Sequence, residues 1–570
     1  MVYIPKVFAD YNLLSPDDIN AMVFSKYRQA LGKETVERIS RQLENYDYYS
    51  GKQHRNEYGA LVKASELPRP PGVDYDPTRY ATNYFKAIVD RKARWQMSGK
   101  HGISVPRRQI DAIEDVLRED YEPSEAQRRE NERAEEYERL LYQLWDENRM
   151  RAKLVQAARD RLIADRVVCK IVYNDRTGKL RWIFRPDNEY IPVYSDDDFE
   201  DLIGAYFIKN KDYEINGEEV PAILIQEYRL VNGMAYLHEG IYRESDLALL
   251  EELSPSADLI EGYKETQRVK LIGLKPKEQD KKLDELAKRV YPELDKRRYL
   301  PLGLDFIPVQ EFPVSELLSE SIGDSEISAL REQNDVLNQM NEDAIDSLKF
   351  EMFEITAITN ATPGAADNFV VAPGSVVEIQ SQGDSKSADI KKVVGSFGWK
   401  EAFKDQYMRV KGAMHEISGL PQIVPQELNF GGLNGEALQV LFHDIITDTE
   451  EHWLSWGYNL AELHAKSIRY LQARVSRPRF SYDRQVVMNI GDNYTNEMRF
   501  VLPLPDNRKE LVELLEMETL AGFESTKGAM ERLGVENIQA KQQEIESERT
   551  RKRNSSAVSY GEEVEEIDGE

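Results

Sequence analysis

Cysteine is nearly absent from this chain of 570 residues, and Cys169 is the one that occurs. A single thiol excludes an intrachain disulfide and a thiolate metal cluster, and it fits a reducing cytosol. Long apolar runs are missing too, since no stretch approaches the roughly 18 apolar residues that a membrane-spanning helix requires. The first residues carry acids and prolines instead of the basic start and apolar centre of a signal peptide. We therefore expect a protein that is neither secreted nor inserted in a membrane.

The sequence signatures of catalysis are also missing. No phosphate-binding loop occurs, and its nearest likeness, Gly522–Gly528, lacks the Gly-Lys-Ser/Thr end. There is no nucleophile elbow, no HExxH and no CxxC. Three of the seven histidines, His443, His452 and His464, share one expected helix, but their spacing does not place two metal ligands on one face. We expect no enzyme, and no catalytic, cofactor-binding or metal-binding residues.

Negative charge dominates what is present. The chain has 102 acidic residues against 75 Lys and Arg, a formal net charge of −27. A protein that reads DNA sequence is usually basic, because phosphate contacts need Lys and Arg. An acidic surface is compatible with DNA that slides past without sticking, although acidity more often serves solubility.

The hydrophobic patterning predicts an α+β protein that is mostly helical. Helical spacing is found over 80–99 and 124–164. At Val167 the sequence changes to alternating residues rich in β-branched and aromatic side chains, which predicts strands. Turns are expected at Asn174–Gly178 and at Asn232-Gly233.

Further along, two amphipathic helices are expected to flank a small β block. The first, 323–351, holds eight acids and two bases. The second covers 386–418, and its part 386–411 holds seven bases against three acids. The two helices therefore differ sharply in charge.

A break follows the second helix. The stretch Gly419–Gly435 contains two prolines and four glycines, too many for regular structure, and it is too apolar for an ordinary solvated linker. Helices are expected again over Glu436–Arg474 and Arg508–Glu548. The last residues are strongly acidic, which predicts a disordered tail.

Five stretches, in order, resemble the portal proteins of long-tailed phages that infect Gram-positive bacteria. They are YYSGKQHRN (Tyr48–Asn56), Ala81–Lys100, GLDFIPVQEFP with the helix after it, ISGLPQI…NFGGLNGEAL (Ile417–Leu438) and Phe500–Gly534. The fourth is the most specific, because the family has a helix ending in Ser-Gly-Val/Leu-Pro, a glycine-rich loop, and Ser-Gly-x-Ala-Leu opening a long helix. Here Asn434 stands where Ser is usual.

This resemblance implies a portal fold with wing, stem, clip and crown, assembled as a ring around a central channel. The parts are expected at 1–322 (N-terminal region and α/β wing), 323–351 (first stem helix), 352–385 (clip), 386–418 (second stem helix), 419–435 (tunnel loop), 436–500 (long helix and wing return), 501–550 (crown) and 551–570 (disordered acidic tail).

The resemblance also implies function and partners. The expected protein sits at one capsid vertex of the virion, after assembly in the host cytoplasm, and conducts double-stranded DNA during packaging and ejection. Its partners would be further copies in a ring of usually twelve, DNA bound without sequence preference, the terminase large subunit, head-completion or adaptor proteins, and the major capsid and scaffolding proteins. No membrane partner is expected.

Two groups of residues are candidates for contact with DNA. In the tunnel loop they are Leu420, Gln422, Ile423, Val424, Asn429, Phe430, Gly431 and Gly432. In the second stem helix they are the bases Lys391, Lys392, Lys400, Lys404, Arg409 and Lys411. The apolar and amide residues of the loop could touch DNA without stalling it, and two adjacent glycines permit unusual backbone angles. For the bases, pairing with the acidic helix of a neighbouring subunit stays open beside contact with DNA phosphates.

Two rival classes remain. One is another capsid-assembly or scaffolding protein built from long acidic helices. The other is a metal-dependent nuclease whose carboxylates lie far apart in the sequence.

Overall fold

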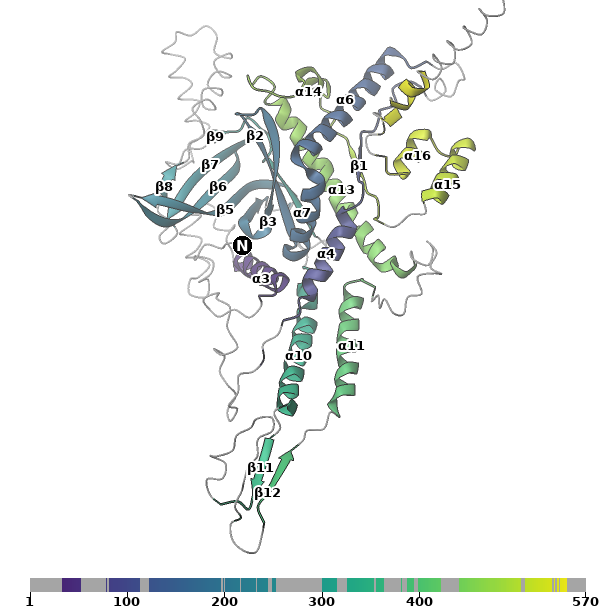
Figure 1. Cartoon of the computed structure of the whole chain (residues 1–570). Coiled ribbons are helices and arrows are strands. Elements are labelled where there is room, and N and C mark those ends of the chain that lie inside the picture. The colour runs from purple at the N-terminus through teal and green to yellow at the C-terminus, as the bar shows by residue number, and fades with distance from the viewer. Residues whose placement is uncertain are drawn as a thin grey trace, which may run out of the picture. The chain divides into compact units, whose positions relative to one another are not determined.

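The computed structural model describes residues 33–52, 78, 81–112, 122–195, 198, 200–215, 217–231, 233–243, 249–252, 300–314, 325–352, 355–362, 381, 387–393, 398–421, 440–503, 508–535, 538, 541–542 and 544–550. These residues mix helices with antiparallel sheets (Figure 1). The chain divides into two compact units. Unit 1 comprises Met1–Tyr46, Ala87–Glu326 and Val424–Glu570, and unit 2 comprises Asp47–Lys86 and Ile327–Ile423. In the described part, no helix is long and apolar enough to cross a bilayer.

The strands of unit 1 form three antiparallel sheets. The three-stranded sheet has the order β10 (Val309–Pro313), β2 (Arg166–Asn174), β3 (Lys179–Pro186). A larger sheet runs through β4 (Tyr190–Tyr194), β5 (Leu202–Ile215), β6 (Glu218–Val231), β7 (Met234–Arg243) and β8 (Leu249–Glu252), and β9 (Leu300–Pro301) pairs with β7. The third pairs β1 (Gly102–Ser104) with β13 (Glu497–Arg499).

Both expected turns are present. Gly178, with φ +70°, precedes β3, and Val231 of β6 pairs with Met234 of β7 across a two-residue loop. Gly233 has φ +72°, the left-handed conformation that such tight hairpin turns need and that glycine adopts without steric cost.

The helices of unit 1 include α6 (Glu125–Asn148), α7 (Met150–Ala164), α13 (His443–Gln472), α14 (Arg484–Asn489), α15 (Arg508–Leu520) and α16 (Thr526–Arg532), together with most of α3 (Lys33–Ser50) and α4 (Tyr84–Met97). Helix α13 contributes many buried side chains to the core of unit 1. Its Trp456 packs on Phe312 of β10 at 4.9 Å between ring centroids, and Ser467 Oγ accepts a hydrogen bond from Trp182 Nε1 at 2.8 Å.

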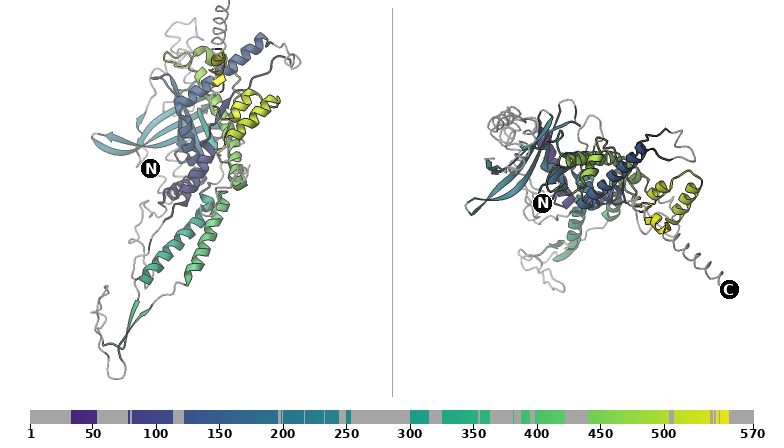
Figure 2. Two further views of the ribbon diagram at one scale, coloured as in Figure 1. Left: turned by 45° about the vertical axis from the view of Figure 1, so that its right-hand side comes forward. Right: turned by 90° about the horizontal axis from the view of Figure 1, so that it is seen from above.

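Unit 2 contains a helix pair. Helix α10 (Arg331–Met352), entered through the short 3₁₀ turn η3 (Ser328–Leu330), leads to β11 (Ile355–Thr359), and β12 (Asp389–Val393) leads back to α11 (Trp399–Ile417). Strands β11 and β12 pair antiparallel, and the two helices run side by side in opposite directions (Figures 1 and 2). The expected pattern of helix, β block and helix is present, with different boundaries.

Three helix predictions need correction. The helix expected over 124–164 is two helices, because Arg149 between α6 and α7 adopts the left-handed conformation with φ 54°. The second stem helix does not begin at 386, since Asp389–Val393 form β12 and α11 begins at Trp399. The helical stretch from Arg508 is interrupted between α15 and α16.

Candidate functional site

The start of α10 and the end of α11, which we call the head of the helix pair, lie in unit 2. The head brings together residues from three of the five family-like stretches, at the end of α3, at the start of α4 and in α10, and α11 packs against them. Each contact described next lies within unit 2.

Tyr48 is at the centre of this joint. Its ring meets Phe85 edge-on, with 5.4 Å between centroids, and the Arg331 guanidinium lies over the same ring at 5.2 Å. The Tyr48 hydroxyl donates a hydrogen bond to Asp335 Oδ2 at 2.8 Å. One aromatic side chain thereby fixes α3, α4 and α10 to one another by stacking, a cation–π contact and a hydrogen bond.

Asn83 connects the same elements through the backbone. Its Nδ2 donates to the Tyr49 carbonyl at 2.6 Å, while its Oδ1 accepts from Lys86 N at 3.0 Å, close to the start of α4. Next to it, Thr82 N donates to Asn338 Oδ1 on α10 at 2.8 Å. These amide contacts explain why an Asn-Tyr pair stands at this point of the sequence.

Helix α11 joins the head through an aromatic ladder. Trp399, Phe403 and Tyr407 follow one another at one-turn spacing, with 5.8 Å between successive ring centroids. The Tyr407 hydroxyl is 2.7 Å from the Tyr84 hydroxyl. Lys411 lies over the Tyr84 ring at 5.8 Å. The face of α11 that carries these rings is therefore its packed face.

The end of α11 has a defined cap. Gly419 has φ +65° and donates its N–H to the Glu416 carbonyl at 3.2 Å, and Leu420 N donates to the His415 carbonyl at 3.1 Å. This pair of bonds is the Schellman arrangement, which requires a left-handed residue and is best met by glycine. Pro421 follows and cannot continue a helix. The Ser-Gly-Leu-Pro sequence is thus the stop signal of the helix.

The structure places the predicted loop residues only in part. Leu420, the first of them, is 4% exposed, so it belongs to the helix end and faces inward within unit 2. The other seven, Gln422, Ile423, Val424, Asn429, Phe430, Gly431 and Gly432, lie outside the described residues. Beyond the loop, in unit 1, Phe442 packs against Trp95 at 5.2 Å between centroids.

The six predicted bases do not share one element. Lys391 and Lys392 lie in strand β12, where they pair with Ala357 and Thr356, and their side chains are outside the described part. Lys400, Lys404 and Arg409 are exposed on α11 without a hydrogen bond or ion pair to any residue that the structure describes. The basic character assigned to a helix over 386–411 is therefore divided between a strand and a helix.

Helix α11 is less basic than the whole stretch 386–411, from which the prediction was made. Helix α11 itself holds four bases and three acids, Glu401, Asp405 and Glu416. Part of the excess of bases expected over 386–411 therefore lies outside α11, which has one base more than its acids.

Unit 1 holds a buried charge cluster that sequence reasoning missed. Lys92 of α4 is 3% exposed, and its Nζ lies 2.6 Å from Glu326 Oε1 and 3.1 Å from Asp448 Oδ1 of α13. Burial lowers the pKa of Lys92, but the two carboxylates outweigh burial and raise it. The ammonium is therefore held in its charged form.

His452 completes this cluster. Ligand atoms of Glu326, Asp448 and His452 lie within 4.8 Å of one another, a spacing that could hold a metal ion. Burial, together with Arg161 and Lys92, lowers the pKa of His452 to about 3, so the ring is neutral. Because the Lys92 ammonium already binds both carboxylates and offsets one of their two negative charges, we assign the cluster to structure. Its one signal in the sequence is the one-turn spacing of Asp448 and His452.

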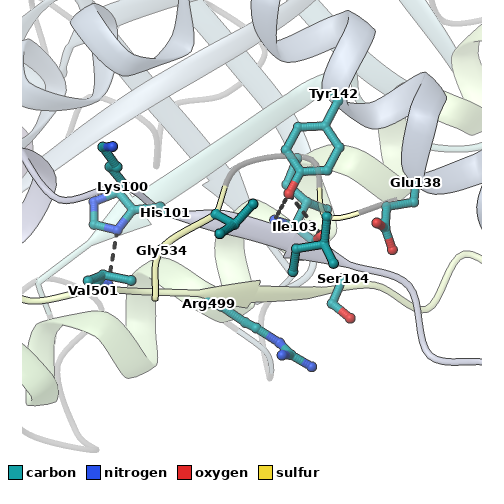
Figure 3. Close-up of a pocket in the computed structure, with 12 residues that line it drawn as sticks. Lys100, His101, Ile103, Ser104, Glu138, Tyr142, Arg499, Val501 and Gly534 are labelled. Atoms are coloured by element: carbon teal, nitrogen blue, oxygen red, sulfur yellow. Dashed lines mark hydrogen bonds between the residues drawn. The ribbon is translucent and has the colours of Figure 1, made fainter. Parts of the chain in front are cut away.

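A small cavity lies in unit 1 between the β1–β13 ribbon, α6 and the residues after α16 (Figure 3). The Tyr142 hydroxyl, which points into it, donates to the Ile103 carbonyl and accepts from Ile103 N, at 3.2 and 2.9 Å. Burial raises the pKa of Glu138 on the same helix. The cavity measures about 40 Å³, room for water and too little for an organic substrate.

A comparison with known protein families finds a match over part of the chain. Residues 293–555 match the family described as phage portal protein, SPP1 Gp6-like. The match covers a little under half of the chain, and it includes the whole helix pair and α13. The sequence matches no curated protein. The portal resemblance is confirmed by this match, while two of the five stretches, Tyr48–Asn56 and Ala81–Lys100, precede the matched residues.

Proposed function

We propose that copies of this chain form the ring-shaped channel at one capsid vertex, through which double-stranded DNA enters and leaves, because residues 293–555 match the family of SPP1-type phage portal proteins. The family places the protein in the virion capsid as a structural component. The observation that carries the proposal is the helix pair of unit 2. Its head is built by the family-like stretches, and its second helix ends in a cap directly before the glycine-rich segment.

We assign the portal parts to the observed elements as follows. Helices α10 and α11 are the two stem helices, and β11 and β12 belong to the clip between them. The sheets before Ser325 are the wing, and α15 and α16 are the crown. Supporting this assignment, the only described strands between the two helices are β11 and β12, as a short excursion from a stem would require.

The tunnel loop 419–435 is the proposed place of DNA contact. It begins at the Gly419 cap and is rich in apolar and amide side chains. Such side chains contact the sugar and phosphate backbone weakly, so repeated contacts around a ring do not hold the DNA in one position. Replacing Asn429 and Phe430 with Gly should leave rings intact and slow DNA packaging.

The remaining partners follow from the proposed role. The clip offers the terminase large subunit a docking surface, and head-completion or adaptor proteins replace the terminase afterwards. The major capsid and scaffolding proteins surround the ring during assembly in the host cytoplasm. No nucleotide loop is found in the sequence, so the force on DNA would come from the terminase.

Negative-stain imaging and mass measurement of the purified full chain test the proposal. Closed rings of about twelve copies are expected without any other component. A scaffolding protein would remain monomeric or form open aggregates, and that outcome would overturn the portal assignment.

A nuclease is tested separately because Glu326, Asp448 and His452 lie together. Incubation of linear double-stranded DNA with the protein and Mg²⁺ or Mn²⁺ should leave the DNA intact. Cleavage that is lost in Asp448→Asn would contradict both the non-enzymatic role and the structural reading of the Lys92 cluster.

A further inference from the structure

One face of α10 is acidic and exposed. Glu332, Val336, Gln339 and Asp343 follow one another at spacings of four, three and four residues, which places them on one side of the helix. We call these four residues the acidic stripe. All four side chains are exposed, and Val336 is 44% exposed. Glu332 and Asp343 have no hydrogen bond or ion pair to any residue in the described part of the chain.

The adjoining face of α10 is used within the chain. Asp335 accepts from Tyr48, Asn338 accepts from Thr82 N, and Asp346 accepts from Thr78 Oγ1 at 2.5 Å. Asn338 lies about one turn after Asp335, and Asp346 lies about two turns further on. All three contact either α3 or the segment that joins α3 to α4. The acidic stripe lies beside this face, and its two carboxylates have no partner among the described residues, so they are available to a partner outside the chain.

Helix α11 carries a matching stripe. Lys400, Lys404, Met408 and Lys411, at spacings of four, four and three residues, lie on one flank beside the packed aromatic ladder. We call these the basic stripe. Lys400 and Lys404 are exposed and have no described partner, and Met408 is 44% exposed like Val336 on the other stripe. Each stripe therefore has an apolar centre between charged positions.

The two stripes have the same length. Glu332 and Asp343 are eleven residues apart, and so are Lys400 and Lys411, which corresponds to about 16 Å along a helix. Helices α10 and α11 run in opposite directions in each copy (Figure 1). Copies related by rotation about one axis keep these directions, so α10 of one copy would meet α11 of the next antiparallel. Asp343 then lies opposite Lys400, and Glu332 opposite Lys411.

We propose that the acidic stripe of one copy packs against the basic stripe of the next, and that this contact sets which faces of the helix pairs meet. The inference rests on the proposed ring. Exposed ion pairs are individually weak, about 0.2–1 kcal/mol each, but they are repeated at every interface and are screened by salt. Ring assembly should therefore weaken as ionic strength rises.

Charge reversal gives the direct test. Asp343→Lys makes its end of the acidic stripe basic, and Lys400→Glu with Lys404→Glu makes the facing end of the basic stripe acidic. Each variant alone should fail to form rings at a concentration where the wild type is fully assembled. Mixed in equal amounts, the two variants should form rings again, because each interface then pairs a basic with an acidic end. Mass photometry and negative-stain imaging give the readout.

A matched control reverses charge elsewhere on α11. Arg409→Glu with Glu416→Lys exchanges two exposed charges on the opposite flank of the helix and should leave rings unaffected. Circular dichroism confirms that all variants fold. If a reversal variant does not fold, Glu332→Gln with Asp343→Asn replaces it, and its assembly should lose at least half of the wild-type dependence on salt.

The outcomes separate the two proposals. Wild-type protein that forms no rings overturns the proposed function and the stripe contact together. Wild-type rings with reversal variants that also form rings overturn the stripe contact alone. Basic-stripe variants that assemble normally but fail to package DNA would assign Lys400 and Lys404 to DNA, which likewise overturns the contact.

Discussion

A buried charge cluster in unit 1 and the exposed charges of the helix pair in unit 2 differ in whether their partners lie within the chain. In unit 1, Arg166 of β2 is 1% exposed as a side chain, and it lies 2.5 Å from Asp187 and 3.0 Å from Glu311. In unit 2, Glu332, Asp343, Lys400 and Lys404 are exposed and have no partner in the described part. A buried charge without a partner is costly, so unit 1 must satisfy its ions internally. The helix pair keeps its charges in water, where they remain available to another molecule.

The largest expected effect is the loss of a buried partner in unit 1. Arg166→Met leaves Asp187, which is fully buried, with less compensation, and it should destabilise the fold by about 3–5 kcal/mol. Urea unfolding followed by tryptophan fluorescence measures this. Arg181→Met on the exposed face of the neighbouring strand β3 is the control and should change the free energy of unfolding by no more than about 0.5 kcal/mol. If Arg166→Met and Arg181→Met lowered the free energy of unfolding equally, the contrast between buried and exposed charges would be wrong.

A somewhat smaller effect is expected from pH. His464 of α13 accepts a hydrogen bond from Trp145 Nε1 at its Nε2 (2.7 Å), and its Nδ1–H donates to Asn496 Oδ1 at 2.7 Å. The indole can only donate, so the neutral ring with hydrogen on Nδ1 is the form that fits. Burial lowers the pKa of His464 to about 4.

The direction in which stability changes with pH follows from the lowered pKa of His464. The unfolded histidine takes up a proton below about pH 6.5 and the folded one does not, so stability is full above pH 6.5 and falls as the pH drops toward 4. The loss from this residue should reach about 3 kcal/mol. His464→Gln, which keeps a donor and an acceptor, should remove the share of His464 from the pH dependence of urea unfolding, while His452, whose pKa burial lowers as well, keeps its own share. His443→Gln, at an exposed position, should leave the pH dependence unchanged.

How much the sequence predicts differs between the same two regions. The two turns of unit 1 and the end of α11 before Gly419 were predicted, because glycine in a left-handed position is a local signal. The break at Arg149 was not, because an arginine with φ 54° carries no such signal. The sequence predicts helix where strand β12 lies, because the pairing of β12 with β11 is a contact between residues thirty or more positions apart.

The candidate site shows the same limit. The family-like stretches were found one by one, but their convergence on Tyr48 depends on contacts between α3, α4 and α10. Periodicity shows that α10 is amphipathic, yet it does not show that Asp335 is hydrogen-bonded to Tyr48 while Asp343 has no partner among the residues that the structure describes. Which acids of a helix are left over is a property of the packed structure.

A moderate effect is expected at the joint of the helix pair. Asn338 is 4% exposed, and its Oδ1 accepts the backbone N–H of Thr82. Asn338→Ala leaves that N–H without its acceptor and should destabilise the joint by about 1–2 kcal/mol. Hydrogen exchange at the Thr82 amide should quicken by roughly tenfold. Gln339→Ala, at the next and exposed position, should leave the exchange rate unchanged.

The smallest expected effect is the sharpest test of the contrast. Glu332→Gln with Asp343→Asn removes two charges from one exposed face, and these carboxylates have no described partner within the chain. At a protein concentration low enough to keep copies apart, the free energy of unfolding should change by less than about 0.5 kcal/mol. Arg166→Met, which removes one charge, should cost several times more under the same conditions. A large effect of the α10 variant on the isolated chain would mean that the acidic stripe is satisfied internally, and the charges of the two units would then follow one rule.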